Sequence, residues 1–206
     1  KNGSIRRIDV LVASMAMERL AQLRQVHPKM RLSINFSASE LVSPDYVQTL
    51  KDLLILYDIP ASAFSLEVTE TQLTEFGEQA LCTMAQLHEL GFGLSLDDFG
   101  TGYNSFVQLN SSFVSTLKID KRFIQAINTD SQDANMVNII LGMGKLHGLH
   151  IVAEGVETKE QLAYLRDASC LLSQGYLLAK PMGFDEFLHF MEGRQLLQQS
   201  RKRLDS

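Results

Sequence analysis

Apolar and polar residues alternate in short runs that recur along the chain, separated by longer segments with helical spacing. The alternating runs predict six β-strands, at 31–37, 64–70, 93–99, 116–121, 150–156 and 171–177. The segments around them predict helices at 9–26, 44–57, 75–90, 134–147, 159–167 and 185–199. Strands that alternate with helices are typical of a parallel sheet with right-handed crossovers. We therefore expect an α/β fold with a single domain over residues 1–206.

The alternation within the strands places polar side chains on one face of the predicted sheet. In the second strand, Leu66 and Val68 point one way while Glu67 and Thr69 point the other. The first and fourth predicted strands show the same pattern. A strand face with amide and charged groups is costly to bury unless the groups serve one another, a metal or a ligand. We expect this face to line a functional site.

The polar residues fall near the C-terminal ends of successive predicted strands. They are spaced by 20 to 36 positions, so each lies on a different strand: Asn35, Glu67, Asp97, Lys118, Glu154 and Gln174. Functional residues at the ends of several strands are typical of a (β/α)8 barrel, whereas an open doubly wound sheet gathers ligand contacts at one switch point. We expect a TIM-like barrel whose N-terminal one or two strands are absent from the 206 residues.

Carboxylates dominate this group. Glu67, Asp97, Asp98 and Glu154 would repel one another if they were left unpaired. Carboxylate and amide oxygens suit Mg²⁺ or Mn²⁺, and two such ions activate a water and stabilise the leaving oxygen of a phosphodiester. Lys118 would be available to hold that water or a phosphate oxygen. The alternative is that Lys118 pairs with an acid inside the barrel and that the remaining acids are solvated loop residues.

A Gly-x-Gly pattern, Gly100 and Gly102, follows Asp97 and Asp98 directly. Backbone N–H groups in such a turn can approach a phosphate. The pattern lacks the GxGxxG spacing of a dinucleotide-binding fold. We interpret the segment as a loop that responds to occupancy of the metal site.

Composition excludes several classes of protein. The chain has 19 basic and 24 acidic residues, net −5, so a broad footprint for duplex nucleic acid is not expected. Cys82 and Cys170 belong to no CxxC pair, which favours a reduced, cytoplasmic chain over a disulfide framework or zinc ribbon. No apolar run approaches the ~18 residues of a membrane span. The first residue is Lys1 and not a methionine, so we expect the sequence to be a piece of a longer protein.

Six motifs in order resemble those of the EAL-domain family of cyclic di-GMP phosphodiesterases. They lie at 33–37, 66–71, 96–103, 117–120 and 152–158, and at Gln174-Gly175-Tyr176 followed by Lys180-Pro181. The resemblance implies a bacterial second-messenger hydrolase with a TIM-like barrel. It also implies hydrolysis of one phosphodiester bond of cyclic di-GMP, to give linear pGpG, with two Mg²⁺ or Mn²⁺ ions.

The same resemblance implies a set of metal ligands. By this likeness Asn35, Glu67 and Asp97 hold the first ion, and Asp97 and Asp98 hold the second. Glu154 assists at the metals or acts as the base.

Other positions gain roles from the resemblance as well. Lys118 contacts the attacking water, while Glu157 and Gln174 support the metal-bound water and the ligand. Glu70 ties the loop that begins at Asp97 to the metal site. The remaining support residues of the loop and the ligand are Thr69, Gly100, Gly102 and Asp120.

One departure from the family leaves the function open. The motif Glu-Ala-Leu followed by an arginine is absent from the 206 residues; the resemblance makes its glutamate a metal ligand and its arginine a phosphate contact. A phosphodiesterase is the leading hypothesis, and an inactive cyclic di-GMP receptor is the second. A different metal-dependent barrel phosphoesterase is the third. The resemblance to the family also implies a homodimer and a sensory or GGDEF domain upstream of this chain.

Overall fold

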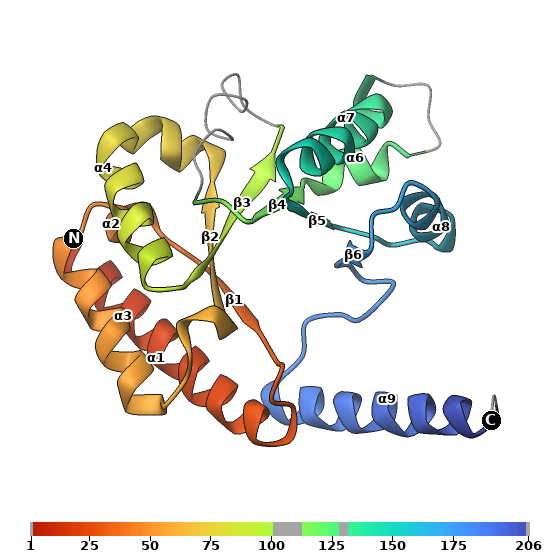
Figure 1. Ribbon diagram of the computed structural model, residues 1–206, viewed down its shortest axis with the longest axis horizontal. Helices are drawn as coiled ribbons and strands as arrows, with labels where there is room; N and C mark the ends of the chain where they lie inside the picture. The colour runs from red at the N-terminus through yellow and green to blue at the C-terminus, as the bar shows by residue number, and fades with distance from the viewer. Residues whose placement is uncertain (1, 101–112, 128–131, 205–206) are drawn as a thin grey trace.

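Six parallel strands form one sheet in the order β1 to β6, each paired with its neighbours in the sequence. This computed structural model describes residues 2–100, 113–127 and 132–204. The sheet curls into half a barrel, with β1 and β6 at its two free edges (Figure 1). The strands are β1 Leu32–Asn35, β2 Phe64–Thr69, β3 Gly93–Phe99, β4 Thr116–Ile119, β5 His150–Ala153 and β6 Leu172–Ser173.

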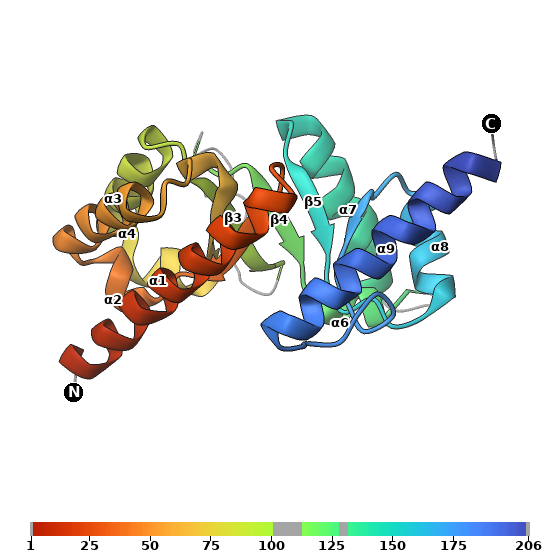
Figure 2. The same ribbon diagram turned by 90° about the horizontal axis from the view of Figure 1, so that it is seen from below.

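Helices cover the outside of this half-barrel. The helices α1, α3 and α4 lie on the side of β1–β3, and α6, α7 and α8 lie on the side of β4–β6 (Figure 1). Seen from below, α1 and α9 lie in front of the sheet (Figure 2). The helices are α1 Asn2–Val26, α2 Ala38–Leu41, α3 Pro44–Tyr57, α4 Glu70–Glu89, α6 Lys121–Gln125, α7 Gln132–His147, α8 Lys159–Asp167 and α9 Phe184–Leu204, with a 3₁₀ turn at Ala61–Ala63.

The outer face of the sheet carries apolar side chains that pack with those of the helices to form the hydrophobic core. Leu66, Leu94 and Leu117 are completely buried there, among apolar side chains of the helices such as Leu20 and Ile140. Removal of this apolar surface from water is the main favourable term in folding. The predicted separation of apolar and polar side chains of β2 onto opposite faces of the sheet is therefore confirmed.

The inner face of the sheet is polar. A cavity of about 590 Å³ inside the half-barrel is lined by hydroxyl groups, among them those of Ser33, Ser65, Ser95 and Thr116, and extends to Lys118. The hydroxyls of Ser65 on β2 and Ser95 on β3 form a hydrogen bond of 2.9 Å. Such pairing lowers the cost of placing polar groups inside a barrel.

Two short helices were not expected from the sequence, and α4 begins earlier than expected. The short helix α2 begins at Ala38, just after the predicted first strand, and α6 begins at Lys121, the last residue of the predicted fourth strand. Helix α4 begins at Glu70 instead of residue 75, because the Thr69 hydroxyl accepts a hydrogen bond from Gln72 N and Gln72 Oε1 accepts one from Thr69 N. Gly77, with φ of 48°, interrupts the same helix.

Every strand but β3 is shorter than predicted, and β6 at an edge of the sheet is shortened most. Strand β6 has only Leu172–Ser173 where 171–177 were expected, and β1 ends at Asn35. An edge strand has one partner instead of two, so less of its backbone is held in the ladder. The outer helices are longer than expected: α1 begins at Asn2, and α9 covers Phe184–Leu204. Within the described residues, no helix combines the length and apolar character that crossing a membrane requires.

Candidate active site

The C-terminal end of β3 carries one residue more than the strand beside it. Residues 96–99 of β3 pair with residues 117–119 of β4, so Asp97 and Asp98 together face the single Lys118. Two residues opposite one define a β-bulge, which changes the direction of the side chains. Asp98 has a left-handed backbone with φ of 53°, a conformation that aspartate tolerates better than most residues.

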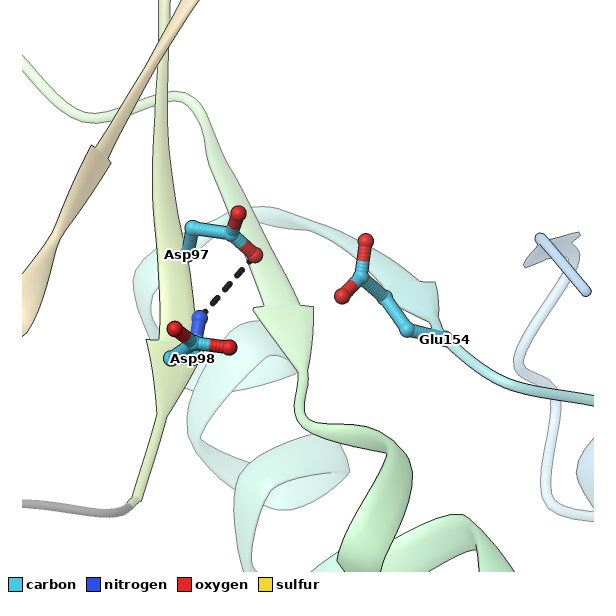
Figure 3. Close-up of side chains that lie close together, drawn as sticks. All are labelled: Asp97, Asp98 and Glu154. Carbon is cyan, nitrogen blue, oxygen red and sulfur yellow. Dashed lines mark hydrogen bonds between the residues drawn. The ribbon is translucent and has the colours of Figure 1, made fainter. Parts of the chain in front are cut away.

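The bulge brings successive carboxylates to the same site. In strict alternation Asp97 and Asp98 would point to opposite faces of the sheet. Instead, one oxygen each of Asp97, Asp98 and Glu154 lies within 4.8 Å of the others, and Figure 3 shows the three side chains converging from β3 and from the end of β5. The Asp98 amide donates a hydrogen bond of 3.0 Å to Asp97 Oδ1 (Figure 3). A cluster of hard oxygen donors is the donor set that Mg²⁺ and Mn²⁺ prefer.

Lys118 lies at the centre of the acidic residues. Its Nζ is 2.7 Å from Glu67 Oε2, 2.7 Å from Glu154 Oε1 and 3.1 Å from Asp97 Oδ1. The lysine side chain is 7% exposed, and those of the three acids are 13%, 18% and 14% exposed in the same order. Lys118 does pair with acids inside the barrel, as the alternative interpretation held. The acids are largely buried partners, however, and not solvated loop residues.

Burial and charge shift the proton affinities of this cluster. Burial acts against the charged form of Lys118, but hydrogen bonds to Glu154 and Glu67 raise its pKa above the usual range. Burial raises the pKa of Glu154, despite the opposing hydrogen bond from Lys118. Burial, the charge of Asp97 and a hydrogen bond with Asp120 raise the pKa of Asp98. Lys118 is therefore a cationic hydrogen-bond donor at neutral pH, and Glu154 and Asp98 are acids with increased proton affinity.

Asn35 and Thr69 lie beside Glu67, on the β1 side of the cluster. Asn35 is exposed at the end of β1 and pairs with Glu67 in the register of the sheet. The three residues line a second cavity of about 420 Å³. The amide of Asn35 is therefore available to a ligand that also contacts Glu67.

Glu157 and Gln174 lie further from the centre. Both are exposed, and no hydrogen bond among the described residues joins either side chain to the acidic cluster. The Glu157 amide donates to Gln161 Oε1 at the start of α8. Gln174 follows β6, where its amide donates to Ala153 O, and it lines the large cavity.

The expected support residues have different surroundings. Glu70 is 2% exposed at the start of α4. Asp120 caps α6, with Oδ1 2.8 Å from the Arg122 amide. Gly100 has a left-handed φ of 91°. Gly102 lies outside the described residues.

Arg122 is a residue that the sequence interpretation missed. Its guanidinium donates a hydrogen bond of 3.0 Å to Gly100 O, three residues after Asp97. Its position two residues after Asp120, at the end of a motif, was the only available signal. Every residue has a backbone carbonyl, so the residue type at position 100 does not indicate that an arginine binds there.

The family model described as "EAL domain" matches residues 1–181. The cyclic di-GMP phosphodiesterase NbdA of Pseudomonas aeruginosa is 37% identical over 191 residues, which are 91% of this chain and 24% of NbdA. The chain therefore spans about a quarter of the length of that relative.

Solved structures show the same arrangement of elements. The structure of the PaMucR phosphodiesterase in complex with cyclic di-GMP is 35% identical, with a TM-score of 0.85 over 90% of this chain and 75% of that one. The manganese and cyclic di-GMP complex of BlrP1 from Klebsiella pneumoniae is 29% identical, with a TM-score of 0.76 over 83% of this chain and 43% of that one. The chain has the TIM-like fold expected from its sequence, and it belongs to the EAL domain family.

Proposed function

We propose that the chain is a metal-dependent phosphodiesterase domain that hydrolyses cyclic di-GMP to linear pGpG. The observation that carries the proposal is the convergence of Asp97, Asp98 and Glu154 within 4.8 Å, beside the buried ammonium of Lys118. The name of NbdA as a cyclic di-GMP phosphodiesterase supports the substrate, and the BlrP1 complex supports a divalent ion.

In this proposal the carboxylates hold two Mg²⁺ or Mn²⁺ ions. Asn35, Glu67 and Asp97 are the ligands of the first, and Asp97 and Asp98 are ligands of the second. When bound, the ions supply a water of lowered pKa and stabilise the leaving oxygen of the phosphodiester. In this proposal Asp97 is the shared ligand, because its Oδ1 contacts the same Lys118 Nζ as Glu67 does, and the bulge places Asp98 beside it.

In this proposal Lys118 is the hydrogen-bond donor of the reaction and Glu154 is the proton acceptor. Lys118 stays charged because Glu154 and Glu67 each accept a hydrogen bond from its Nζ, so it donates to the attacking water or to a phosphate oxygen. Glu154 has a raised pKa through burial, which suits a group that accepts a proton from that water. Glu157 and Gln174 act at the rim, where their exposed side chains contact bound water and ligand.

The decisive experiment is incubation with cyclic di-GMP and Mn²⁺, followed by chromatography of the nucleotides. Two forms are compared: the 206-residue chain, and the same chain with a segment that supplies the Glu-Ala-Leu motif ahead of Lys1. We expect pGpG from the second form, and its absence would refute the proposal. Asp97→Asn should abolish turnover, whereas Asp133→Asn on the exposed side of α7 should not change it.

A receptor that binds cyclic di-GMP without hydrolysis is the second candidate. Calorimetry distinguishes the two functions: tight binding by both forms, with no product from either, would establish the receptor. Absence of binding would exclude it.

The proposal extends to the surroundings of the domain. MucR carries the name of a bifunctional diguanylate cyclase and cyclic di-GMP phosphodiesterase. We infer a similar context for this chain: a cytoplasmic location, an upstream sensory or GGDEF domain and a homodimer. Analytical ultracentrifugation tests the dimer directly, and a single monomeric species at micromolar concentration would exclude it.

A further inference from the structure

We propose that Arg122 is a positioning residue that holds the Asp97–Asp98 bulge in the shape required for metal binding. The inference rests on the proposed function, because it assigns Arg122 a part in the same two-ion site. It concerns a residue on α6 that is not among the proposed ligands of that site.

The first support is a hydrogen bond to the backbone that leaves the bulge. Arg122 Nη2 donates to Gly100 O over 3.0 Å. The backbone of Arg122 is held by its amide, which donates to Asp120 Oδ1 over 2.8 Å, and its guanidinium lies 4.3 Å from the centre of the Phe123 ring. A donor fixed in this way has little rotamer freedom left to lose when it binds the carbonyl.

The second support is the backbone that Arg122 holds. Asp98 and Gly100 have left-handed φ values of 53° and 91° on either side of Phe99. Such conformations persist when the surrounding structure constrains them. On one side, Gly100 lies against Phe123: a Cβ at residue 100 would be 3.0 Å from Phe123 Cε2. On the other side, the guanidinium of Arg122 holds the carbonyl.

The third support is the small contribution that this contact makes to overall stability. Arg122 is exposed, and an exposed hydrogen bond adds little to the free energy of unfolding. Phe99 and Phe123 anchor the same region in the core, both 1% exposed. Loss of the guanidinium is therefore expected to loosen the end of the bulge without unfolding the domain.

The test measures Mn²⁺ binding to the full chain by electron paramagnetic resonance, without substrate. Arg122→Ala should weaken binding by about 10-fold, the lower end of the range for residues that orient metal ligands. Arg122→Lys keeps a donor and should restore part of the affinity. The matched control is Lys121→Ala, which removes an equal charge from the adjacent exposed position and should leave affinity unchanged.

A second measurement does not depend on metal. Hydrogen exchange of the 96–100 amides should be faster in Arg122→Ala than in Lys121→Ala, with equal melting temperatures. Unchanged exchange, or equal loss of Mn²⁺ affinity in both variants, would overturn the inference. If the unaltered chain binds Mn²⁺ but forms no pGpG in either form, the proposed function fails while the affinities still decide the role of Arg122. If it binds no Mn²⁺, hydrogen exchange alone decides.

Discussion

The centre of the sheet and its edges hold their polar residues in different ways. On β2–β4, Glu67, Asp97 and Lys118 are largely buried and joined by contacts of 2.7 and 3.1 Å. At the edges, Asn35 at the end of β1 and Gln174 after β6 are exposed. A central strand is held by a neighbour on each side, whereas an edge strand has only one. The centre of the site is therefore built before any ligand arrives, while its rim depends on the ligand.

The largest effect is expected from Lys118→Met, which removes the cation from the centre. Glu67, Asp97 and Glu154 would lose their shared partner, and breaking a buried ion pair costs about 3–5 kcal/mol of unfolding free energy. Urea unfolding in EDTA measures this loss. Mn²⁺ should offset part of it, since a cation again lies among the carboxylates.

The edge supplies the control for that experiment. Gln174→Ala should change the free energy of unfolding by less than about 0.5 kcal/mol, because the side chain is exposed. Equal destabilisation by the two variants would show that the centre is no more preorganised than the rim.

A smaller effect is expected from Gly175→Ala, which acts on the backbone of the β6 edge. A Cβ at this position would lie 2.2 Å from Val156 O, so the chain after β6 would have to move away from the chain after β5. Overpacking of this kind costs about 2 kcal/mol. Gly142→Ala on α7 is the control: its Cβ meets nothing within 4 Å, and it should stabilise the helix by about 0.5–1 kcal/mol. Thermal unfolding separates the two, and equal melting temperatures would contradict the account.

The smallest effect is expected from Glu40→Gln, next to β1. Burial raises the pKa of Glu40, which is 3% exposed and accepts a hydrogen bond from the Ser37 amide. The folded state therefore binds the proton more tightly than the unfolded state. Its contribution to stability is fully present below the unfolded pKa and is lost as pH rises through the folded pKa.

Glutamine has no such proton, so Glu40→Gln should gain stability relative to the unaltered protein as the pH is raised from 4 to 8. Denaturant unfolding at several pH values measures the difference. Glu75→Gln, at an exposed position of α4, is the control. A difference that shrinks with rising pH would contradict the assignment.

The sequence predicted which face of the central strands carries the polar residues, because the apolar and the polar positions of these strands gave the same answer. Apolar residues such as Leu66 and Leu94 alternate with Glu67 and Ser95. Because neighbouring side chains of a strand point to opposite faces, burial of the leucines against the helices directs the polar side chains to the other face. The start of α4 was missed although its Thr-x-x-Gln capping box, Thr69 to Gln72, is visible in the sequence. Strand alternation competed for the same residues.

Other features of the site are not visible in any single segment. Asp98 joins Asp97 only because β3 has an extra residue relative to β4, and a bulge is a property of the pair of strands. The contact of Arg122 with Gly100 O depends on how α6 packs beside the end of β3. To predict either feature, one must know how two elements are aligned with each other, and the periodicity of residues within one element does not give that alignment.

The bulge makes the sheet less regular, but it supplies the site with a second carboxylate. Deletion of Asp98 would leave as many residues on β3 as on β4 between the flanking pairs, and it would remove a left-handed residue with φ of 53°. The shortened strand would form a more ideal ladder, yet it would have one carboxylate where the site has two. A screen that selects only for thermal stability would therefore favour this deletion, and with it a domain that folds well and has lost half of its paired aspartates.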